Sequence, residues 1–157
     1  MIYINRWSRQ LISHYASRVL RRLEDKPTWL INQLYLRAHR LLADAFAQVG
    51  SRGHHYRLLA ALEQHGPTSQ ADLGRATGID RSDIVEALNE MAAEGYVQRT
   101  ADSSDRRRNV ITMTGRGTRR LAELEPVVTQ VQVSLLAPLN RAERRQFLAL
   151  MRKVAGA

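Results

Sequence analysis

The stretch DRRRNVITMT, residues 105–114, decides the fold of this chain. It places three consecutive arginines in a polar loop, directly before a β-prone run from Asn109 to Met113. A second β-prone run, Tyr96 to Thr100, precedes the loop, so the two runs predict a β-hairpin with a basic tip. Arginines on such a hairpin can reach the phosphates and the minor groove of a DNA duplex. This part of the chain therefore predicts a DNA contact.

Two short helices joined by a turn are predicted just before the hairpin. Thr68-Ser69 offers an N-cap for a helix through Ala76, and Asp80 caps a further helix to Glu94. The turn between them contains Gly78, which can adopt a positive φ. The inward face of the second helix is expected to comprise Ile84, Leu88 and Met91. A helix-turn-helix followed by a hairpin is the order of a winged helix-turn-helix.

Longer helices are predicted on both sides of this lobe. The apolar spacing favours helices over residues 6–23, 28–49, 55–64 and 114–137, and a last helix after the break at residues 138–140. The helix over 28–49 is apolar on more than one face, which suggests a subunit interface. Pro126 lies inside the helix over 114–137 and could kink or split it. The expected fold class is mainly α with a small β-hairpin wing.

The composition is that of one globular domain with an excess of arginine. The chain has 157 residues, 44% of them hydrophobic, a net charge of +9 and no cysteine. Without cysteine there is no disulfide, zinc thiolate or cysteine nucleophile. We expect no membrane-spanning helix and no secretory signal, because no apolar run is long enough. A cytoplasmic location fits these features.

The positive charge is concentrated in two segments. Residues 1–26 carry six basic and two acidic groups, and residues 99–120 carry seven arginines and two aspartates. Localised patches of this kind indicate contact surfaces for a polyanion. The basic N-terminal segment could add phosphate contacts or pack over a dimer interface. It could also lie on a membrane surface, although its apolar stripe is short and we expect no membrane partner.

Several motifs, in order and at consistent spacing, resemble those of the MarR family of bacterial transcription regulators. They are Leu73-Gly74-Arg75-Ala76-Thr77-Gly78-Ile79-Asp80-Arg81-Ser82, then Leu88, then Glu94-Gly95-Tyr96-Val97, then Asp105-x-Arg107 and Thr114-x-x-Gly117. The resemblance implies a homodimer whose two winged lobes bind a palindromic operator in double-stranded DNA. It also implies that Arg107 reaches the minor groove and that Asp105 holds Arg107 in place.

The resemblance divides the chain into three parts. Residues 1–26 would form a basic helical extension, residues 27–50 and 115–157 a helical dimerisation region, and residues 51–114 the DNA-binding lobe. The implied function is that of a sequence-specific transcriptional regulator, in the form of a repressor that a small-molecule effector releases. The alternative is a non-specific architectural DNA-binding protein without an effector response.

The expected DNA contacts come from both helices of the helix-turn-helix and from the wing. Arg81 can pair with guanine, Asn89 with adenine, and Val85 can meet a thymine methyl group. The full set is Ser69, Gln70, Arg81, Ser82, Val85, Glu86, Asn89, Arg99, Asp105, Arg106, Arg107 and Arg108.

The recognition helix departs from the family pattern because it is acidic. Residues 80–94 contain five acids and one arginine. Asp80 and Asp83 suit the helix N-terminus, where carboxylates favour the macrodipole. Glu86 could accept a hydrogen bond from cytosine, or repel phosphate and sharpen specificity. This composition suggests that the wing and the N-terminal patch carry more of the affinity.

An effector pocket is expected between the dimerisation helices and the winged lobe, again by resemblance. An aromatic cleft with one cation would suit a small aromatic or phenolic carboxylate. The candidate lining residues are Trp29, Tyr35, His39, His55, Tyr56 and Arg57. Taken singly, each is better explained by core packing or by a solvated surface.

We expect no cofactor, no metal site and no catalytic residues. The histidines lack partners at reliable metal-ligand spacing. The chain contains no glycine-rich phosphate loop and no nucleophile elbow. An enzyme is therefore the less favoured class of function.

Overall fold

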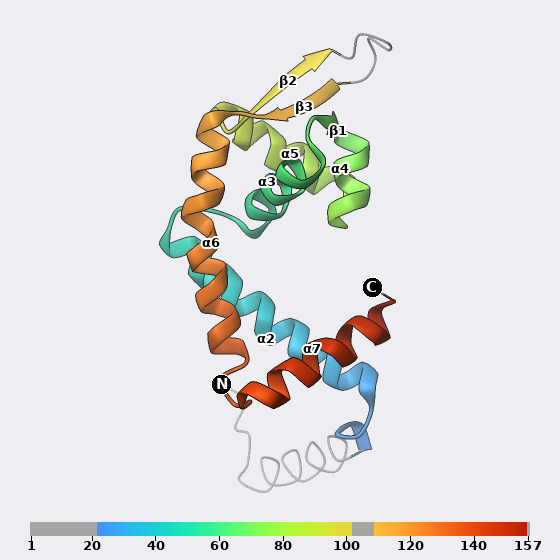
Figure 1. Ribbon diagram of the computed structural model, residues 1–157. Helices are drawn as coiled ribbons and strands as arrows, with labels where there is room; N and C mark the ends of the chain where they lie inside the picture. The colour runs from blue at the N-terminus through green and yellow to red at the C-terminus, as the bar shows by residue number, and fades with distance from the viewer. Residues whose placement is uncertain (1–21, 102–108, 157) are drawn as a thin grey trace, which may run out of the picture. The chain divides into compact units, whose positions relative to one another are not determined.

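The structure is a computed structural model that describes residues 22–101 and 109–156. The chain divides into two compact units, Met1–Arg40 and Leu41–Ala157. The described part of the first unit consists mainly of the start of α2. The second unit contains the end of α2 and all later elements. In chain order, the described elements are α2 (Pro27–Gln48), α3 (Gly53–His65), β1 (Thr68–Ser69), α4 (Gln70–Thr77), α5 (Arg81–Ala93), β2 (Val97–Ala101), β3 (Asn109–Met113), α6 (Gly115–Leu135) and α7 (Arg141–Ala155) (Figure 1).

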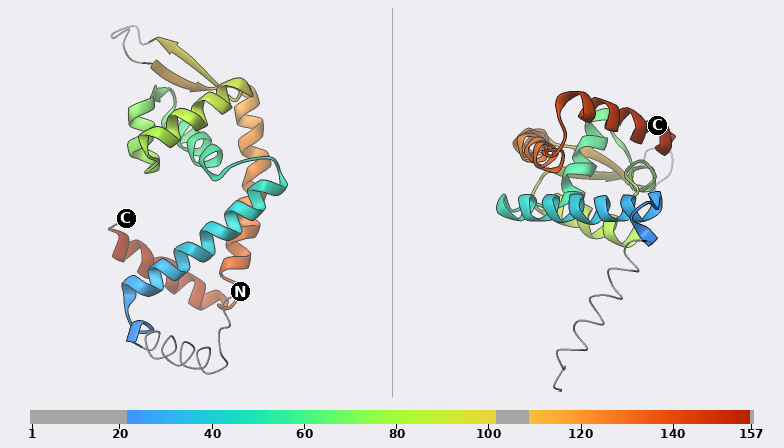
Figure 2. Two further views of the ribbon diagram at one scale, coloured as in Figure 1. Left: turned by 180° about the vertical axis from the view of Figure 1, so that it is seen from behind. Right: turned by 90° about the horizontal axis from the view of Figure 1, so that it is seen from below.

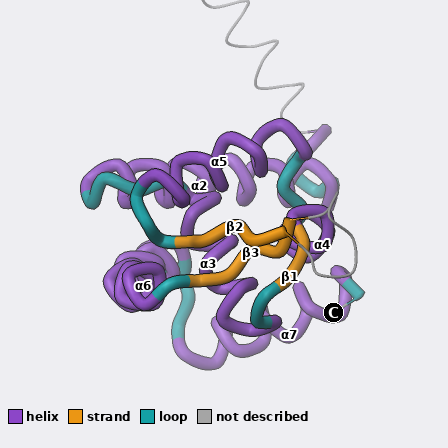
Figure 3. Tube along the Cα trace, turned by 90° about the horizontal axis from the view of Figure 1, so that it is seen from above, coloured by secondary structure: helices purple, strands orange, loops and turns teal. Residues whose placement is uncertain are grey.

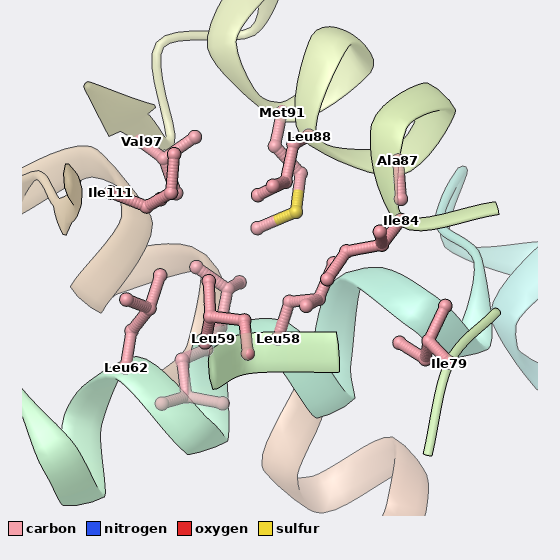
Figure 4. Packing of buried hydrophobic residues seen from close by; sticks show 12 residues of the cluster. Leu58, Leu59, Leu62, Ile79, Ile84, Ala87, Leu88, Met91, Val97 and Ile111 are labelled. Carbon is pink, nitrogen blue, oxygen red and sulfur yellow. The ribbon is translucent and has the colours of Figure 1, made fainter. Parts of the chain in front are cut away.

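The core of the second unit lies where α3, α4 and α5 meet the sheet. Three leucines of α3 point into it, and the stripe expected on α5 is buried, with Ile84 2% exposed and Leu88 and Met91 fully buried (Figure 4). The predicted inward face of the second short helix is therefore confirmed. The other core residues are Leu58, Leu59, Leu62, Leu73, Ile79, Ala87, Val97, Ile111 and Leu121.

The predicted hairpin is present as β2 and β3, which pair in antiparallel register from Val97↔Met113 to Ala101↔Asn109. The hairpin extends past α4 and α5 in two opposite views of the molecule (Figures 1 and 2). The mainly helical fold with a small hairpin is thus confirmed.

A third strand, β1, was not predicted from the sequence. Thr68 pairs with Ile111 and Ser69 with Val110, so β3 is the central strand of a sheet in the order β1-β3-β2 (Figure 3). A strand of two residues has no periodicity of its own to detect. Its pairing places the start of α4 beside Val110 and Asn109, at the end of β3 that lies away from Met113.

Pro126 does not split α6, which continues from Gly115 to Leu135. Leu121, Leu124 and Val131 are buried on either side of that proline and belong to one helix face.

The last helix, α7, begins at Asn140, which forms a capping box with Glu143. No residue of α7 is buried, although it carries several large apolar side chains. Among the described residues, no helix has the length and hydropathy needed to cross a bilayer.

Candidate nucleic-acid interface

The α5 helix is held in place by its buried face and by the turn that precedes it. Gly78 adopts φ +63°, a left-handed conformation that ends α4 and lets the chain reverse. The next residue, Ile79, is buried in the core. Asp80 stands at the N-cap position of α5, as expected, but its side chain makes no capping hydrogen bond. These anchors fix which face of α5 meets solvent.

The residues expected to read DNA from α5 lie on that solvent face. Arg81, Ser82 and Asn89 are exposed, and Val85 is 40% exposed although it is apolar. An exposed valine among polar side chains is what a contact to a thymine methyl group requires. The arrangement presents a surface of mixed polar and apolar groups on a helix that can enter a major groove.

The start of α4 borders the same surface. Ser69 is the N-cap of α4, and its hydroxyl oxygen accepts a hydrogen bond from the backbone N–H of Asp72 at 3.2 Å. The side chain of Ser69 is therefore engaged in the fold, whereas Gln70 is partly exposed at the first helical position. A hollow of about 590 Å³ lies beside these residues. It is lined by Ser69, Gln70, Ala71, Gly74, Arg75, Ile79, Arg81, Ile84 and Asn109.

Two arginines from outside α5 offset part of its acidic charge. The Nη1 atom of Arg52 lies 3.0 Å from Oε1 of Glu86 and 3.0 Å from Oε1 of Glu90. Arg116, in the first turn of α6, lies 3.6 Å from Glu94. Three of the five carboxylates of residues 80–94 thus have a cationic partner from another element. Sequence reasoning missed these pairs, because Arg52 is 34 residues from Glu86.

His55 extends this cluster into the protein interior. The residue is 8% exposed, and its Nε2 atom lies 3.0 Å from Oε2 of Glu90. Burial lowers the pKa of His55 below its ordinary value, because desolvation penalises the charged imidazolium. Glu90 opposes this shift, while Arg52 and Arg120 add to it. The imidazole of His55 therefore stays neutral down to a lower pH than the imidazole of a solvated histidine.

The wing residues fall into two groups. Arg99 lies on β2, is exposed and pairs in register with Ile111 of β3. The predicted contacts Asp105, Arg106, Arg107 and Arg108 lie outside the described residues. Ala101 and Asn109, which bracket residues 102–108, are register partners, so the segment connects the two strands at the end of the hairpin. The roles of Asp105 and Arg107 remain predictions.

The residues proposed for an effector pocket divide between the two units. In the first unit, the rings of Tyr35 and His39 lie 5.9 Å apart, Tyr35 is 62% exposed, and Trp29 is partly buried. The structure does not relate these three to the other candidates, so a shared pocket stays a prediction.

The three candidates on α3 face three different elements. His55 meets Glu90 of α5, whereas the Tyr56 hydroxyl donates to Oε2 of Glu125 on α6 at 2.8 Å. Arg57 donates to the carbonyl of Thr77 at the end of α4, at 3.4 Å. Desolvation, followed by the hydrogen bond to Glu125, raises the pKa of Tyr56. Consecutive residues of a helix point about 100° apart, which explains why the three do not converge.

Comparison with known proteins places the lobe in a family. Residues 50–108 match the family model described as MarR family. The HTH-type transcriptional repressor NicR of Pseudomonas putida is 35% identical over 96 residues, which are 61% of this chain and 61% of NicR. The match therefore spans about three fifths of that relative's length.

Two solved structures extend the similarity to most of the fold. BpsR of Bordetella bronchiseptica, described in a study of how 6-hydroxynicotinic acid regulates its DNA binding, has a TM-score of 0.75 and 26% identity. The comparison covers 85% of this chain and 95% of BpsR. The PcaV regulator of Streptomyces coelicolor, solved with its natural ligand, has a TM-score of 0.71 and 28% identity, covering 86% of this chain and 95% of PcaV.

Proposed function

The chain belongs to the MarR family, and from that premise we propose that it is a sequence-specific DNA-binding transcriptional regulator. The observation that carries the proposal is the geometry of α5. Its inner face is locked in the core, while Ser82, Val85 and Asn89 are exposed on the outer face. Such a helix, followed directly by a hairpin, fits the major groove with the hairpin over the flanking DNA.

Selection of DNA by the protein tests this proposal. The wild-type chain would be used to select duplexes from a random-sequence library, and its affinity for a selected duplex and for random duplexes would be compared at one salt concentration. A specific regulator gives a ratio of about 10³ or more, whereas an architectural binder gives a ratio near one. A ratio near one would favour the second candidate function, and no binding at all would refute both.

The proposed active form is a homodimer on a palindromic operator, with residues 27–50 and 115–157 as the dimerisation region. Family membership supports this, and so does the surface of α7. That helix exposes Leu150, Met151 and Val154 by 53%, 50% and 78% of their surfaces. Exposed apolar side chains on a helix with no buried residue are typical of a subunit interface.

Sedimentation measurements test the dimer. The double variant Leu150→Asp and Met151→Asp should sediment as a monomer, because burying two carboxylates in an interface is costly. Arg145→Asp, at an exposed polar position on the opposite face of the same helix, is the control and should stay dimeric. A double variant that stays dimeric would exclude this face of α7 from the interface.

We also propose that the protein is a repressor and that a small aromatic or phenolic acid releases it from DNA. NicR is named as a repressor, the DNA binding of BpsR is regulated by 6-hydroxynicotinic acid, and PcaV was solved with its natural ligand. The test adds 6-hydroxynicotinic acid or 4-hydroxybenzoic acid to the protein bound to a selected duplex. Release by either acid, but not by cyclohexanecarboxylic acid, would support the effector class.

The proposal includes two further expectations. A regulator of bacterial transcription works on chromosomal DNA, so the proposed location is the cytoplasm. Members of this family are transcription regulators, and we propose that this chain has no enzymatic activity.

A further inference from the structure

The α5 helix presents an electrostatic problem for a helix that must approach DNA. Glu86 lies on the exposed side of α5, one turn from Ser82 and from Asn89 of the proposed reading surface, and its side chain is 65% exposed. Glu90 follows one turn later. A bare carboxylate this close to the phosphates would weaken binding, since DNA affinity is dominated by neutralisation of phosphate charge.

Arg52 lies between these two carboxylates. A single nitrogen, Nη1, is 3.0 Å from an oxygen of Glu86 and 3.0 Å from an oxygen of Glu90. The other oxygen of Glu90 lies 3.0 Å from Nε2 of buried His55. Glu90 is therefore held from two sides, and Arg52 bridges it to Glu86.

The backbone just before Arg52 is hydrogen-bonded to a side chain of α6. Arg52 is the N-cap residue of α3, in the junction that joins α2 to α3. Arg120 of α6 donates from Nη2 to the carbonyl oxygens of Val49 at 2.6 Å and Gly50 at 3.3 Å. The junction of residues 49–52 thus contacts α6 through its backbone and α5 through the Arg52 side chain.

The high exposure of the Arg52–Glu86 ion pair indicates that the pair affects the charge of α5 more than the stability of the fold. The side chains of Arg52 and Glu86 are 61% and 65% exposed, and ion pairs in solvent add little to folding stability. Their effect on a polyanion bound nearby does not depend on folding stability. It depends on the net charge that α5 presents to the DNA.

We propose that Arg52 is a positioning residue for DNA recognition, whose single positive charge offsets half of the negative charge of Glu86 and Glu90 so that α5 can enter the major groove. The inference rests on the proposed function and adds a residue that contacts α5 rather than DNA. It also gives the α2–α3 junction an influence on affinity. Without Arg52, Glu86 and Glu90 lose the cation that they share, and the exposed Glu86 is left unpaired on the side of α5 that meets solvent.

The test compares Arg52→Gln with the triple variant Arg52→Gln, Glu86→Gln and Glu90→Gln. Affinity is measured at one salt concentration on a duplex selected by the wild-type protein from a random library. Arg52→Gln should weaken binding on the order of 10-fold, or about 1.4 kcal/mol. The triple variant should return to within about 3-fold of wild type, because the uncompensated carboxylates are gone. Glu63→Gln, at an exposed position of α3 outside the proposed contacts, is the control and should bind as the wild type does.

Two results would overturn the inference. One is unchanged affinity of Arg52→Gln. The other is a loss that the triple variant does not restore, together with a salt slope reduced by about one, which would mean that Arg52 contacts a phosphate directly. Melting temperatures check that each variant folds. Should Arg52→Gln fail to fold, the affinity of the double variant Glu86→Gln and Glu90→Gln for the selected duplex tests the inference in its place. It must bind at least as tightly as wild type, and weaker binding refutes the inference. Failure of the wild type to select any duplex would refute the proposed function itself, and the inference with it.

Discussion

The backbone carbonyl of Tyr96 lies against Gly117 so closely that no side chain fits between them. A Cβ on residue 117 would overlap that carbonyl oxygen and stand 2.8 Å from Cγ of Met113. Gly117 belongs to the first turn of α6, and Tyr96 and Met113 flank the base of the hairpin. The glycine thus sets how closely α6 approaches the wing.

Replacing Gly117 by alanine should destabilise the protein. The backbone of Tyr96 must move to admit the methyl group, and overpacking of this kind costs about 1–3 kcal/mol. Denaturant unfolding of Gly117→Ala measures the change. Gly115→Ala, two residues earlier in the same turn, is the control, because the nearest atom to its new Cβ is the end of the Arg119 side chain at 3.9 Å. Equal stability of the two variants would contradict the close approach.

Thr114 fastens the same turn through its hydroxyl group. Its Oγ1 donates to the carbonyl of Gly95 at 2.7 Å and accepts from the N–H of Gly117 at 3.0 Å. Thr114→Ala should lower the free energy of unfolding by about 1 kcal/mol, as expected for loss of an N-cap. Thr114→Ser keeps the oxygen and should retain most of the stability. A serine variant as unstable as the alanine variant would assign the effect to the methyl group instead.

The sequence predicts the parts of the site that depend on local pattern. The i, i+4, i+7 spacing of Ile84, Leu88 and Met91 sets the buried face of α5, and the opposite face follows from it. The hairpin and the caps at Ser69 and Thr114 are local in the same sense. Each cap depends on residues within a few positions of one another, and the hairpin depends on two strands that are neighbours in the sequence.

The parts that could not be predicted depend on contacts between distant segments. The pairing of Thr68 with Ile111 makes a strand of two residues that have no strand signal alone. The ion pairs of Arg52 with Glu86 and Glu90 link segments that nothing in the local pattern connects. The sequence therefore shows an acidic recognition helix, and only the fold shows where its compensating arginines lie.

Stability should depend on pH through His55. Its pKa is lowered in the folded state, so between that value and about 6.5 the unfolded chain binds more protons. The free energy of unfolding should therefore be unaffected by this group above about pH 6.5 and should fall as the pH decreases below it. The groups that face the imidazole and set this behaviour are Glu90, Arg52 and Arg120.

The histidine variant His55→Asn should flatten that dependence, because asparagine can still hydrogen-bond to Glu90 but does not titrate. Denaturant unfolding at a series of pH values measures the slope. His54→Asn removes an imidazole from the same turn of α3 but leaves the pair of His55 and Glu90 in place, so the slope should persist. An undiminished slope in His55→Asn would assign the pH dependence to other groups.

Arg107→Ala tests the wing, where the family resemblance predicts a minor-groove contact. Loss of a contact to the DNA bases should weaken binding by about 1–3 kcal/mol, on the order of 10- to 100-fold in Kd. Sedimentation should show an intact dimer, since residues 105–108 lie outside the proposed dimerisation region. Arg106→Ala and Arg108→Ala offer the contrast within the same run: an arginine that contacts only phosphate should weaken selected and random duplexes alike and reduce the salt slope by about one. Wild-type affinity in Arg107→Ala would remove this residue from the interface and leave recognition to α5 and the other arginines of the wing.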